Sequence, residues 1–193
     1  MPNDPCVFID RDGTLVEEVG YVNDPKQLRF FPRSAAAVRL LNGAGMRAVM
    51  VTNQSGVARG YFSEDVLNTV HAELVAWLKS EGAFLDGIYV CTHHPTEGQP
   101  PYRRRCDCRK PEPGLLLRAA RELGLDLSAS FLVGDKSADV EAAGRAGVTP
   151  ILVLTGYGLG EWESGRERWT STPDHVAPDL LEAVHWILER RRG

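Results

Sequence analysis

Short apolar runs that alternate with helical segments constrain the fold of this chain of 193 residues more than any other feature. The runs are rich in β-branched residues and too short for helices, so they predict buried strands at 6–10, 46–52, 87–90, 131–134 and 150–154. Helices are predicted between and after them, at 34–41, 63–79, 113–123, 137–146 and 178–191. This alternation predicts an α/β fold, with a mostly parallel sheet covered by helices on both faces.

The composition supports a single domain over residues 1–193, because 43% of the residues are hydrophobic and can fill one core. No apolar run reaches the roughly 18 residues of a membrane span, and the first residues lack a signal-peptide pattern. The net charge of −4 gives no general attraction to nucleic acid or anionic membranes. We therefore predict a cytoplasmic monomer that binds neither.

Local signals predict where elements begin and where loops lie. Ser34, Ser63 and Ser137 are expected to be helix N-caps, and Pro113 suits a first helical position. Long connections at 14–33 and 91–113 interrupt the alternation, and loops of that length are usually functional. No insertion is long enough for a large cap domain. The Gly-, Glu- and Arg-containing segment 156–173 is predicted to be a loop, and its role stays open.

Acidic residues directly follow the first predicted strand. In an open parallel sheet, ligands bind at the carboxyl ends of the strands. Asp10 and Asp12 lie two residues apart, so both can project into one pocket while Arg11 points elsewhere. Gly13 then lets the chain turn.

Two further strand ends add polar groups at the same edge. The second strand runs into residues 52–55, whose hydroxyl, amide and backbone N–H groups could hold phosphate oxygens. The fourth runs into Asp135, Lys136 and Asp139. Crowded carboxylates repel one another, and a hard divalent cation relieves that repulsion, so Mg²⁺ is a predicted cofactor. Asp139 could equally complement the dipole of its own helix.

Three cysteines and a histidine form two pairs with the same spacing, Cys91 with His93 and Cys106 with Cys108. Four such ligands predict a structural Zn²⁺ site in a loop over residues 91–108. The alternatives are free thiols or a disulfide between Cys106 and Cys108. His94 is adjacent, but only His93 has the two-residue spacing that the second pair repeats. We expect zinc to position the residues that follow Cys108 over the phosphate pocket.

A basic run, Arg103 to Arg105, lies beside Arg109 and Lys110. A solvated basic turn is its simplest interpretation. A zinc-containing nucleic-acid-binding module would use the run to contact phosphates. That alternative leaves the acidic strand ends unexplained, and the negative net charge opposes it.

The order of these motifs resembles the haloacid dehalogenase superfamily. The resemblance rests on Asp10-x-Asp12-Gly13-Thr14, Thr52, Lys110 before Pro111, and Gly134-Asp135 with Asp139. It implies a Rossmann-like fold in which Asp10 is the nucleophile and Asp12 the general acid and base. Further roles implied by the resemblance are Mg²⁺ binding by Asp10, the Asp12 carbonyl and Asp135, orientation of these carboxylates by Lys136, and phosphoryl binding by Thr52, Arg109 and Lys110.

The cysteine loop narrows the resemblance to the D-glycero-D-manno-heptose 1,7-bisphosphate 7-phosphatases and the histidinol-phosphate phosphatases. The segments 20–22, 52–60, 91–95, 106–111 and 134–136 are most similar to the heptose group. This implies removal of the 7-phosphate of a small phosphorylated sugar through an aspartyl-phosphate. The substrate contacts implied are Glu18, Val19, Gly20, Tyr21, Thr52, Asn53, Gln54, Ser55, Arg109 and Lys110. Histidinol-phosphate hydrolysis and a sugar-phosphate sensor without turnover are the alternatives.

Overall fold

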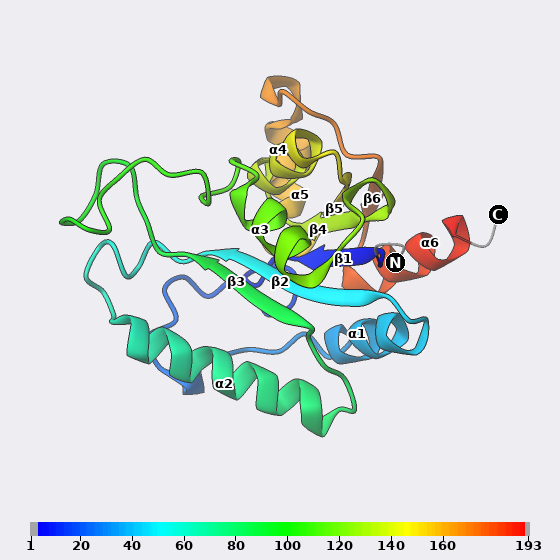
Figure 1. Ribbon diagram of the computed structural model, residues 1–193, viewed down its shortest axis with the longest axis horizontal. Helices are drawn as coiled ribbons and strands as arrows, with labels where there is room; N and C mark the ends of the chain where they lie inside the picture. Colours follow the sequence, from blue (N-terminus) through cyan, green and yellow to red (C-terminus); the bar gives the residue numbers. More distant parts are fainter. Residues whose placement is uncertain (1–3, 192–193) are drawn as a thin grey trace.

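A computed structural model describes residues 4–191 and places six parallel strands in one sheet (Figure 1). The strands lie in the order β3-β2-β1-β4-β5-β6. Their bounds are β1 Cys6–Ile9, β2 Arg47–Asn53, β3 Gly87–Cys91, β4 Phe131–Gly134, β5 Thr149–Val153 and β6 His175–Ala177. All five pairings between neighbouring strands are parallel, as the alternating sequence predicts.

The direction in which the chain adds strands reverses at β1. β2 and β3 lie on one side of β1, whereas β4, β5 and β6 lie on the other. Ligands bind in the crevice outside the carboxyl ends of the strands at such a reversal. The ends of β1 and β4 therefore position the site, and Asp10 and Asp135 follow them directly.

Helices cover both faces of the sheet (Figure 1). The α-helices are α1 Ser34–Gly43, α2 Glu64–Ser80, α3 Gly114–Leu123, α4 Ser137–Ala146, α5 Gly158–Ser164 and α6 Leu180–Arg190. Three short 3-10 helices, η1 Pro25–Gln27, η2 Leu127–Ala129 and η3 Arg166–Arg168, lie in the connections. Within residues 4–191, none of the helices has both the length and the apolar character that crossing a membrane requires.

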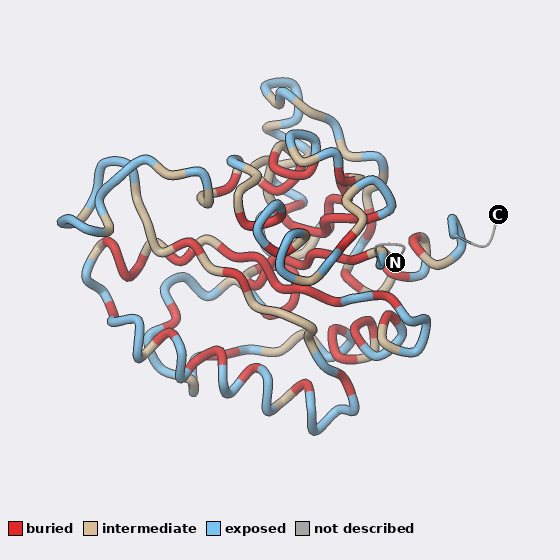
Figure 2. Tube along the Cα trace, in the orientation of Figure 1, coloured by how far each residue is buried: buried red, intermediate tan, exposed pale blue. Residues whose placement is uncertain are grey.

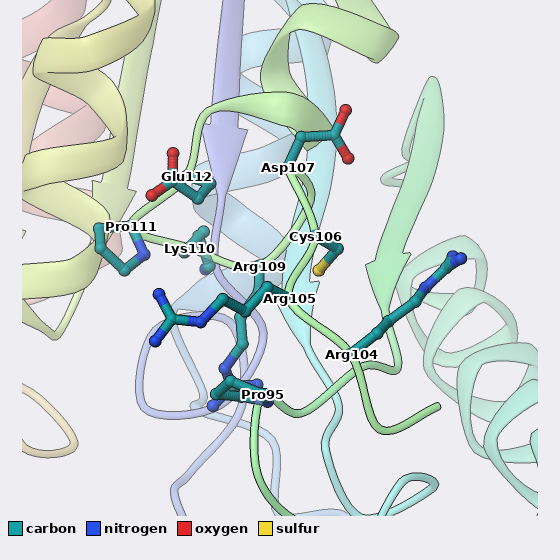
Figure 3. A pocket seen from close by; sticks show the side chains of 9 residues that line it. All are labelled: Pro95, Arg104, Arg105, Cys106, Asp107, Arg109, Lys110, Pro111 and Glu112. Atoms are coloured by element: carbon teal, nitrogen blue, oxygen red, sulfur yellow. The ribbon is translucent and has the colours of Figure 1, made fainter. Parts of the chain in front are cut away.

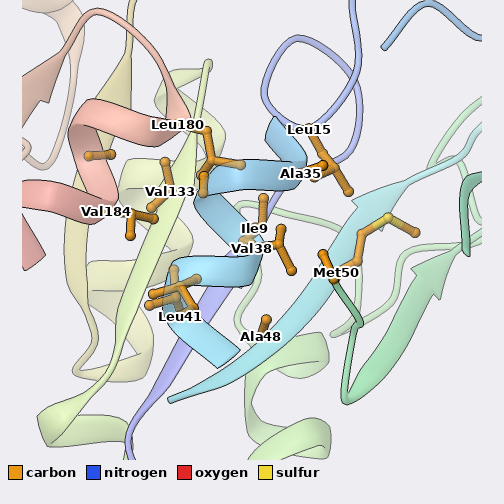
Figure 4. Close-up of a cluster of buried hydrophobic side chains, with 14 of the residues drawn as sticks. Ile9, Leu15, Ala35, Val38, Leu41, Ala48, Met50, Val133, Leu180 and Val184 are labelled. Atoms are coloured by element: carbon orange, nitrogen blue, oxygen red, sulfur yellow. The ribbon is translucent and has the colours of Figure 1, made fainter. Parts of the chain in front are cut away.

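The core forms on both faces of β1, whose side chains alternate between two clusters. Val7 and Ile9 pack with α1, α2 and α6, whereas Cys6 and Phe8 pack with α3 and α4. Figure 4 shows part of the first cluster, and in Figure 2 the buried colour follows the central strands. Burial of one large apolar side chain stabilises the fold by about 1.5–3 kcal/mol. The two clusters therefore hold the strand that carries Asp10 from both sides.

The prediction of a loop over 156–173 is wrong, because α5 and η3 lie within this range. Two glycines in α5 lower its helix propensity, so the sequence pattern does not predict a helix there. Gly158 is nonetheless required, since a Cβ there would lie 1.8 Å from the carbonyl oxygen of Val153. The sequence pattern also fails to reveal β6, because three residues are too few to show a period.

Of the three predicted N-caps, Ser63 is confirmed, since its side chain accepts from a backbone N–H of α2. Ser34 and Ser137 are instead the first residues of α1 and α4. Pro113 is the N-cap of α3 rather than its first residue. At α4, the carboxylate of Asp139 accepts a hydrogen bond from the backbone N–H of the residue before the helix, at 3.2 Å. The side chain that caps α4 therefore belongs to a residue within the helix, whereas an N-cap serine would precede it.

The connection between β3 and α3 is a long excursion that projects beyond the sheet (Figure 1). It packs on the connection between β2 and α2, because Tyr102 contacts the buried cluster of Val57, Phe62 and Leu67. The two long connections at 14–33 and 92–113 thus reach the end of the sheet where Asp10 lies.

Candidate functional site

Asp10 and Lys110 form a buried ion pair at the end of β1. The Lys110 ammonium donates to Asp10 Oδ1 at 2.8 Å and to the carbonyl oxygen of Val51 at 2.9 Å, and it also pairs with Asp139. Both partners of the pair are 5% exposed. Burial works against the charged ammonium, but the Asp10 and Asp139 carboxylates outweigh it and raise the pKa of Lys110 above its usual value. The lysine is therefore a fixed positive charge beside Asp10.

Three carboxylates meet at this point. Asp10, Asp135 and Asp139 each contribute one oxygen to a group whose atoms all lie within 4.8 Å of one another. Gly13 makes this approach possible, because a Cβ there would lie 2.1 Å from Asp135 Oδ2 and its φ is +80°. Only glycine adopts that backbone region without strain. Both Asp135, a predicted metal ligand, and Asp139, which the sequence left ambiguous, thus lie beside Asp10.

The carboxylate of Asp135 suits a divalent cation. Its Oδ2 accepts from the backbone N–H of Tyr157 at 2.9 Å, whereas its buried Oδ1 has no hydrogen-bond partner among the described residues. Burial and the nearby Asp10 charge raise the pKa of Asp135 to about 8. An oxygen ligand that is buried, unpaired and crowded by carboxylates fits Mg²⁺, which would compensate its charge.

We expect the thermal stability of the magnesium-free protein to fall as the pH rises towards 8. The folded protein keeps the Asp135 proton up to a pKa of about 8, whereas the unfolded chain loses it near about pH 4. Between these values the folded state binds more protons, so this contribution to stability is complete below about pH 4 and is lost by about pH 8. Melting temperatures across this range measure the effect.

Saturating Mg²⁺ should flatten this pH dependence, because the cation replaces the proton as the compensating charge. Asp135→Asn, which cannot titrate, should also reduce the slope without magnesium. Equal slopes for the wild type and Asp135→Asn would contradict the assignment.

Asp12 lies next to Asp10 and is held at both carboxylate oxygens. Arg11 Nε donates to Oδ1 at 2.9 Å, and Gln54 Nε2 donates to Oδ2 at 2.7 Å. Burial raises the pKa of Asp12, and the charge of Arg11 opposes that rise. Arg11 points away from the pocket, as the sequence predicts. Its guanidinium contacts the Asp12 carboxylate on the side away from the cavity.

Thr52 and Asn53 line the site at the end of β2, and Gln54 contacts Asp12. Gln54 Nε2 also donates to Thr52 Oγ1 at 2.9 Å, and both side chains are buried. The Asn53 side chain pairs with the backbone of Lys110 in both directions, at 3.0 and 3.1 Å. Ser55 is half-buried. The amides expected to contact substrate therefore also fix Asp12 and Lys110.

A cavity of about 50 Å³ lies directly over this group. Its lining residues are Asp10, Asp12, Thr52, Asn53, Lys110, Lys136, Ala138 and Asp139. The volume suits a metal ion and a phosphoryl group rather than a whole sugar. The remainder of a larger ligand must extend outside it.

The predicted substrate residues 18–21 lie on the connection after β1 and line neither the small cavity nor the basic pocket described next. The Glu18 carboxylate accepts from the backbone N–H of Gly20 at 2.8 Å and from Lys136 Nζ at 3.1 Å. Val19 and Tyr21 are exposed, and the Tyr21 ring packs edge-on against Tyr61. Glu18 thus anchors this loop to Lys136, whose Nζ lies 4.0 Å from Asp135 Oδ1.

A larger basic pocket of about 380 Å³ adjoins the small cavity, and Lys110 lines both. Its lining residues are Pro95, Arg104, Arg105, Cys106, Asp107, Arg109, Lys110, Pro111 and Glu112 (Figure 3). In Figure 3 the Arg105 side chain extends to the opposite side of the chain from Arg104. All three arginines of the basic run are exposed, as in a solvated turn, and two of them line this pocket.

The structure brings the four predicted zinc ligands together. Cys91 Sγ lies 2.9 Å from Cys108 Sγ and 3.6 Å from Cys106 Sγ, and His93 Nδ1 lies 3.3 Å from Cys108 Sγ. The sulfurs of a Zn²⁺ tetrahedron with bonds of about 2.3 Å are separated by roughly 3.8 Å. All of these cysteines are free thiols, so the alternative disulfide is absent from the described residues. Contact with Cys91 and burial raise the pKa of Cys108, so a bare thiolate is unfavourable there without a cation beside it.

His94 lies outside this cluster. Its Nδ1 accepts from the backbone N–H of Glu97 at 2.9 Å, and its Nε2 lies 3.3 Å from the Arg59 guanidinium. Arg109 instead donates to the carbonyl oxygen of His93 at 3.2 Å. The cysteine cluster is thus connected through one side chain and the adjoining backbone to the residues of the basic pocket.

The chain matches known proteins over nearly its whole length. It is 48% identical over 183 residues to a protein of Pasteurella multocida (strain Pm70) named D-glycero-beta-D-manno-heptose-1,7-bisphosphate 7-phosphatase, with 93% of this chain and 97% of that one covered. The HAD-hydrolase-like family model, named for haloacid dehalogenase, matches residues 107–183. The chain belongs to the HAD-like phosphatase family.

Other members of the HAD-like family agree in sequence and structure. A protein of Escherichia coli (strain K12) with the same name is 46% identical over 186 residues, covering 95% of this chain and 88% of that one. The crystal structure of D,D-heptose 1.7-bisphosphate phosphatase from B. bronchiseptica, complexed with magnesium and phosphate, is 33% identical. It superposes with a TM-score of 0.85 over 96% of this chain and 99% of that one. The predicted superfamily and fold class are confirmed.

Sequence reasoning missed part of this HAD-like site. It assigned no role to His71, which is 6% exposed and contacts Arg11. The available signal was an imidazole between Val70 and Leu74 on the apolar face of α2. Nothing local showed that Gln54 would hold Asp12, because their contact spans 42 positions of the chain.

Proposed function

We propose that this HAD-like phosphatase removes the 7-phosphate of D-glycero-D-manno-heptose 1,7-bisphosphate. The observation that carries the proposal is that Lys110 lines two adjoining spaces. One is the small cavity, where Lys110 pairs with the buried Asp10, and the other is the basic pocket. A bisphosphate requires two subsites that bind phosphate, and the small cavity and the basic pocket supply them. The names of the relatives at 48% and 46% identity support the same substrate.

Asp10 is the proposed nucleophile. Its carboxylate attacks phosphorus, a bond forms between an Asp10 oxygen and phosphorus, and the bond from phosphorus to the sugar oxygen breaks. Asp12 gives its proton to the leaving sugar oxygen. In the second step Asp12 takes a proton from water, which attacks phosphorus and releases phosphate and free Asp10. Lys110 compensates charge on the phosphoryl oxygens, and Thr52 hydrogen-bonds the phosphoryl group.

Asp10, Asp135 and the backbone carbonyl of Asp12 are the proposed Mg²⁺ ligands, with Lys136 orienting Asp135. The buried, unpaired Asp135 Oδ1 supports this assignment. When bound, the cation supplies positive charge to the transferring phosphoryl group. Asp139 is assigned to Lys110, with which it pairs in the buried site.

Zn²⁺ is proposed to bind Cys91, His93, Cys106 and Cys108 as a structural ion. Four ligands leave no open position for substrate. Its role is to hold the segment that ends in Arg109 and Lys110. The hydrogen bond from Arg109 to the carbonyl oxygen of His93 supports this role.

The basic pocket is proposed to hold the phosphate that does not react, through Arg105 and Arg109 as planar bidentate donors. Residues 18–21 and 53–55 are proposed to border the sugar between the two subsites. The position of the 18–21 loop, anchored through Glu18 to Lys136 beside the small cavity, supports that location.

We expect at least a 100-fold preference in kcat/KM for heptose 1,7-bisphosphate over histidinol phosphate, about 2.7 kcal/mol of discrimination between transition states. Phosphate release is measured for both with Mg²⁺, using each anomer of the heptose substrate. Arg105→Gln should raise KM for the bisphosphate but not for heptose 7-phosphate. Arg103→Gln is the matched control, because Arg103 is exposed and lies outside the lining of the pocket. A preference for histidinol phosphate would overturn the proposed substrate.

A further inference from the structure

A buried network extends behind Asp12, away from the cavity. Arg11 is fully buried, and its guanidinium contacts Asp12 Oδ1 at 2.9 Å, Gln54 Oε1 at 3.0 Å and His71 Nε2 at 3.2 Å. Gln54 closes the network by donating to Asp12 Oδ2. The two oxygens of Asp12 are thus fixed by two side chains that also fix each other.

His71 comes from α2 and contacts the far side of the Arg11 guanidinium. A guanidinium only donates hydrogen bonds, so His71 Nε2 must be the acceptor and carry no proton. Burial and the Arg11 charge lower the pKa of His71 to about 3, in keeping with a neutral ring. The imidazole therefore serves as a neutral acceptor at neutral pH.

The guanidinium needs this acceptor because it is buried. Arginine has five N–H donors, and a buried donor without a partner is unfavourable by about 1–3 kcal/mol, more when it is charged. Without His71, the Nη1 group would have to find water or rotate. Rotation would move the Nε edge that faces Asp12 and the Nη2 group that faces Gln54.

We propose that His71 is a positioning residue for Asp12, acting through Arg11 and Gln54 to hold the Asp12 carboxylate in place as a base. This inference rests on the proposed function, since it assigns a supporting residue to the second chemical step. In that step the proton of the attacking water passes to Asp12, a bond forms between the water oxygen and phosphorus, and the bond from phosphorus to Asp10 breaks. Asp12 has given up its proton in the first step, and the donors on both of its oxygens hold the carboxylate in the orientation for this transfer.

The test compares His71→Ala with His71→Gln in the full chain with Mg²⁺. Glutamine places an amide oxygen near the position of Nε2 and should restore the acceptor. With p-nitrophenyl phosphate, whose leaving group needs no proton from Asp12, we expect His71→Ala to lower kcat about tenfold per folded molecule by slowing the second step. The ratio kcat/KM should change less than about twofold, because it does not depend on the second step and the subsites are intact. The fraction of chain carrying phosphate in acid-quenched steady-state reactions should rise, and His71→Gln should reverse both effects.

Leu74→Ala is the matched control, because Leu74 is fully buried on the same helix and contacts the core rather than Arg11. It should lower thermal stability without increasing the phosphorylated fraction. The measurements use heptose 1,7-bisphosphate and p-nitrophenyl phosphate in parallel. Wild-type turnover of the aryl phosphate alone would reject the proposed substrate and still test His71. With the aryl phosphate, unchanged kcat in His71→Ala, a fall in kcat without phosphoenzyme accumulation, or no rescue by glutamine would overturn the positioning role.

Discussion

Replacing Asp10 with asparagine should lower kcat/KM by roughly 10⁴-fold or more. A carboxamide cannot form the acyl phosphate and is a weaker ligand for Mg²⁺. Lys110 keeps two of its three partners, Asp139 and the Val51 carbonyl, so its charge stays compensated. The fold should therefore survive while turnover is lost. Phosphate release from heptose 1,7-bisphosphate and thermal melting of the same preparation measure the two effects.

The matched control is Asp174→Asn, which makes the same chemical change at an exposed position. It should leave kcat/KM within about twofold of the wild type. Acid-quenched reactions should trap phosphate on the wild type and on Asp174→Asn but not on Asp10→Asn. Turnover by Asp10→Asn above about 1% of the wild-type rate would reject Asp10 as the nucleophile, once intact mass has excluded deamidation back to aspartate.

Loss of zinc should have the second large effect, on stability and activity together. Three sulfurs and an imidazole nitrogen lie within 4.8 Å of one another, and the segment that follows them carries Lys110 into the core. Structural zinc contributes about 10–16 kcal/mol to folding in isolated zinc peptides, and the rest of this fold reduces that dependence. We expect Cys108→Ala to lose bound zinc, to lower the melting temperature by about 10 °C and to lower kcat/KM by about 100-fold.

Cys6→Ala provides the control, because Cys6 is also a buried core thiol but is not one of the four side chains of the cysteine cluster. It should retain one zinc per chain and normal kcat per folded molecule. Metal content by atomic spectroscopy, melting and phosphate release are measured on the same samples. Chelation that removes all zinc while melting temperature and kcat stay unchanged would reject a structural role for the cluster.

The parallel sheet and the ends of its central strands could be predicted because their signals are local. Short apolar runs mark β1 and β4, and the polar residues that follow them must lie at one edge of the sheet. The two-residue spacing likewise places the side chains of each pair, Cys91 with His93 and Cys106 with Cys108, close to each other. The predictions failed where the local signal was weak, as at glycine-containing α5 and three-residue β6.

The sequence by itself determined which chemical groups gather at the strand ends and in the cysteine loop: Asp10, Asp12 and Asp135, and the three thiols and imidazole of the cysteine cluster. Only the tertiary structure decided which buried groups pair with which. Lys110 reaches Asp10 across 100 positions of the chain, and His71 reaches Arg11 across 60. Such pairs depend on how distant elements pack. A buried charge without a partner is strongly unfavourable, so its partner is the polar group that packing places beside it.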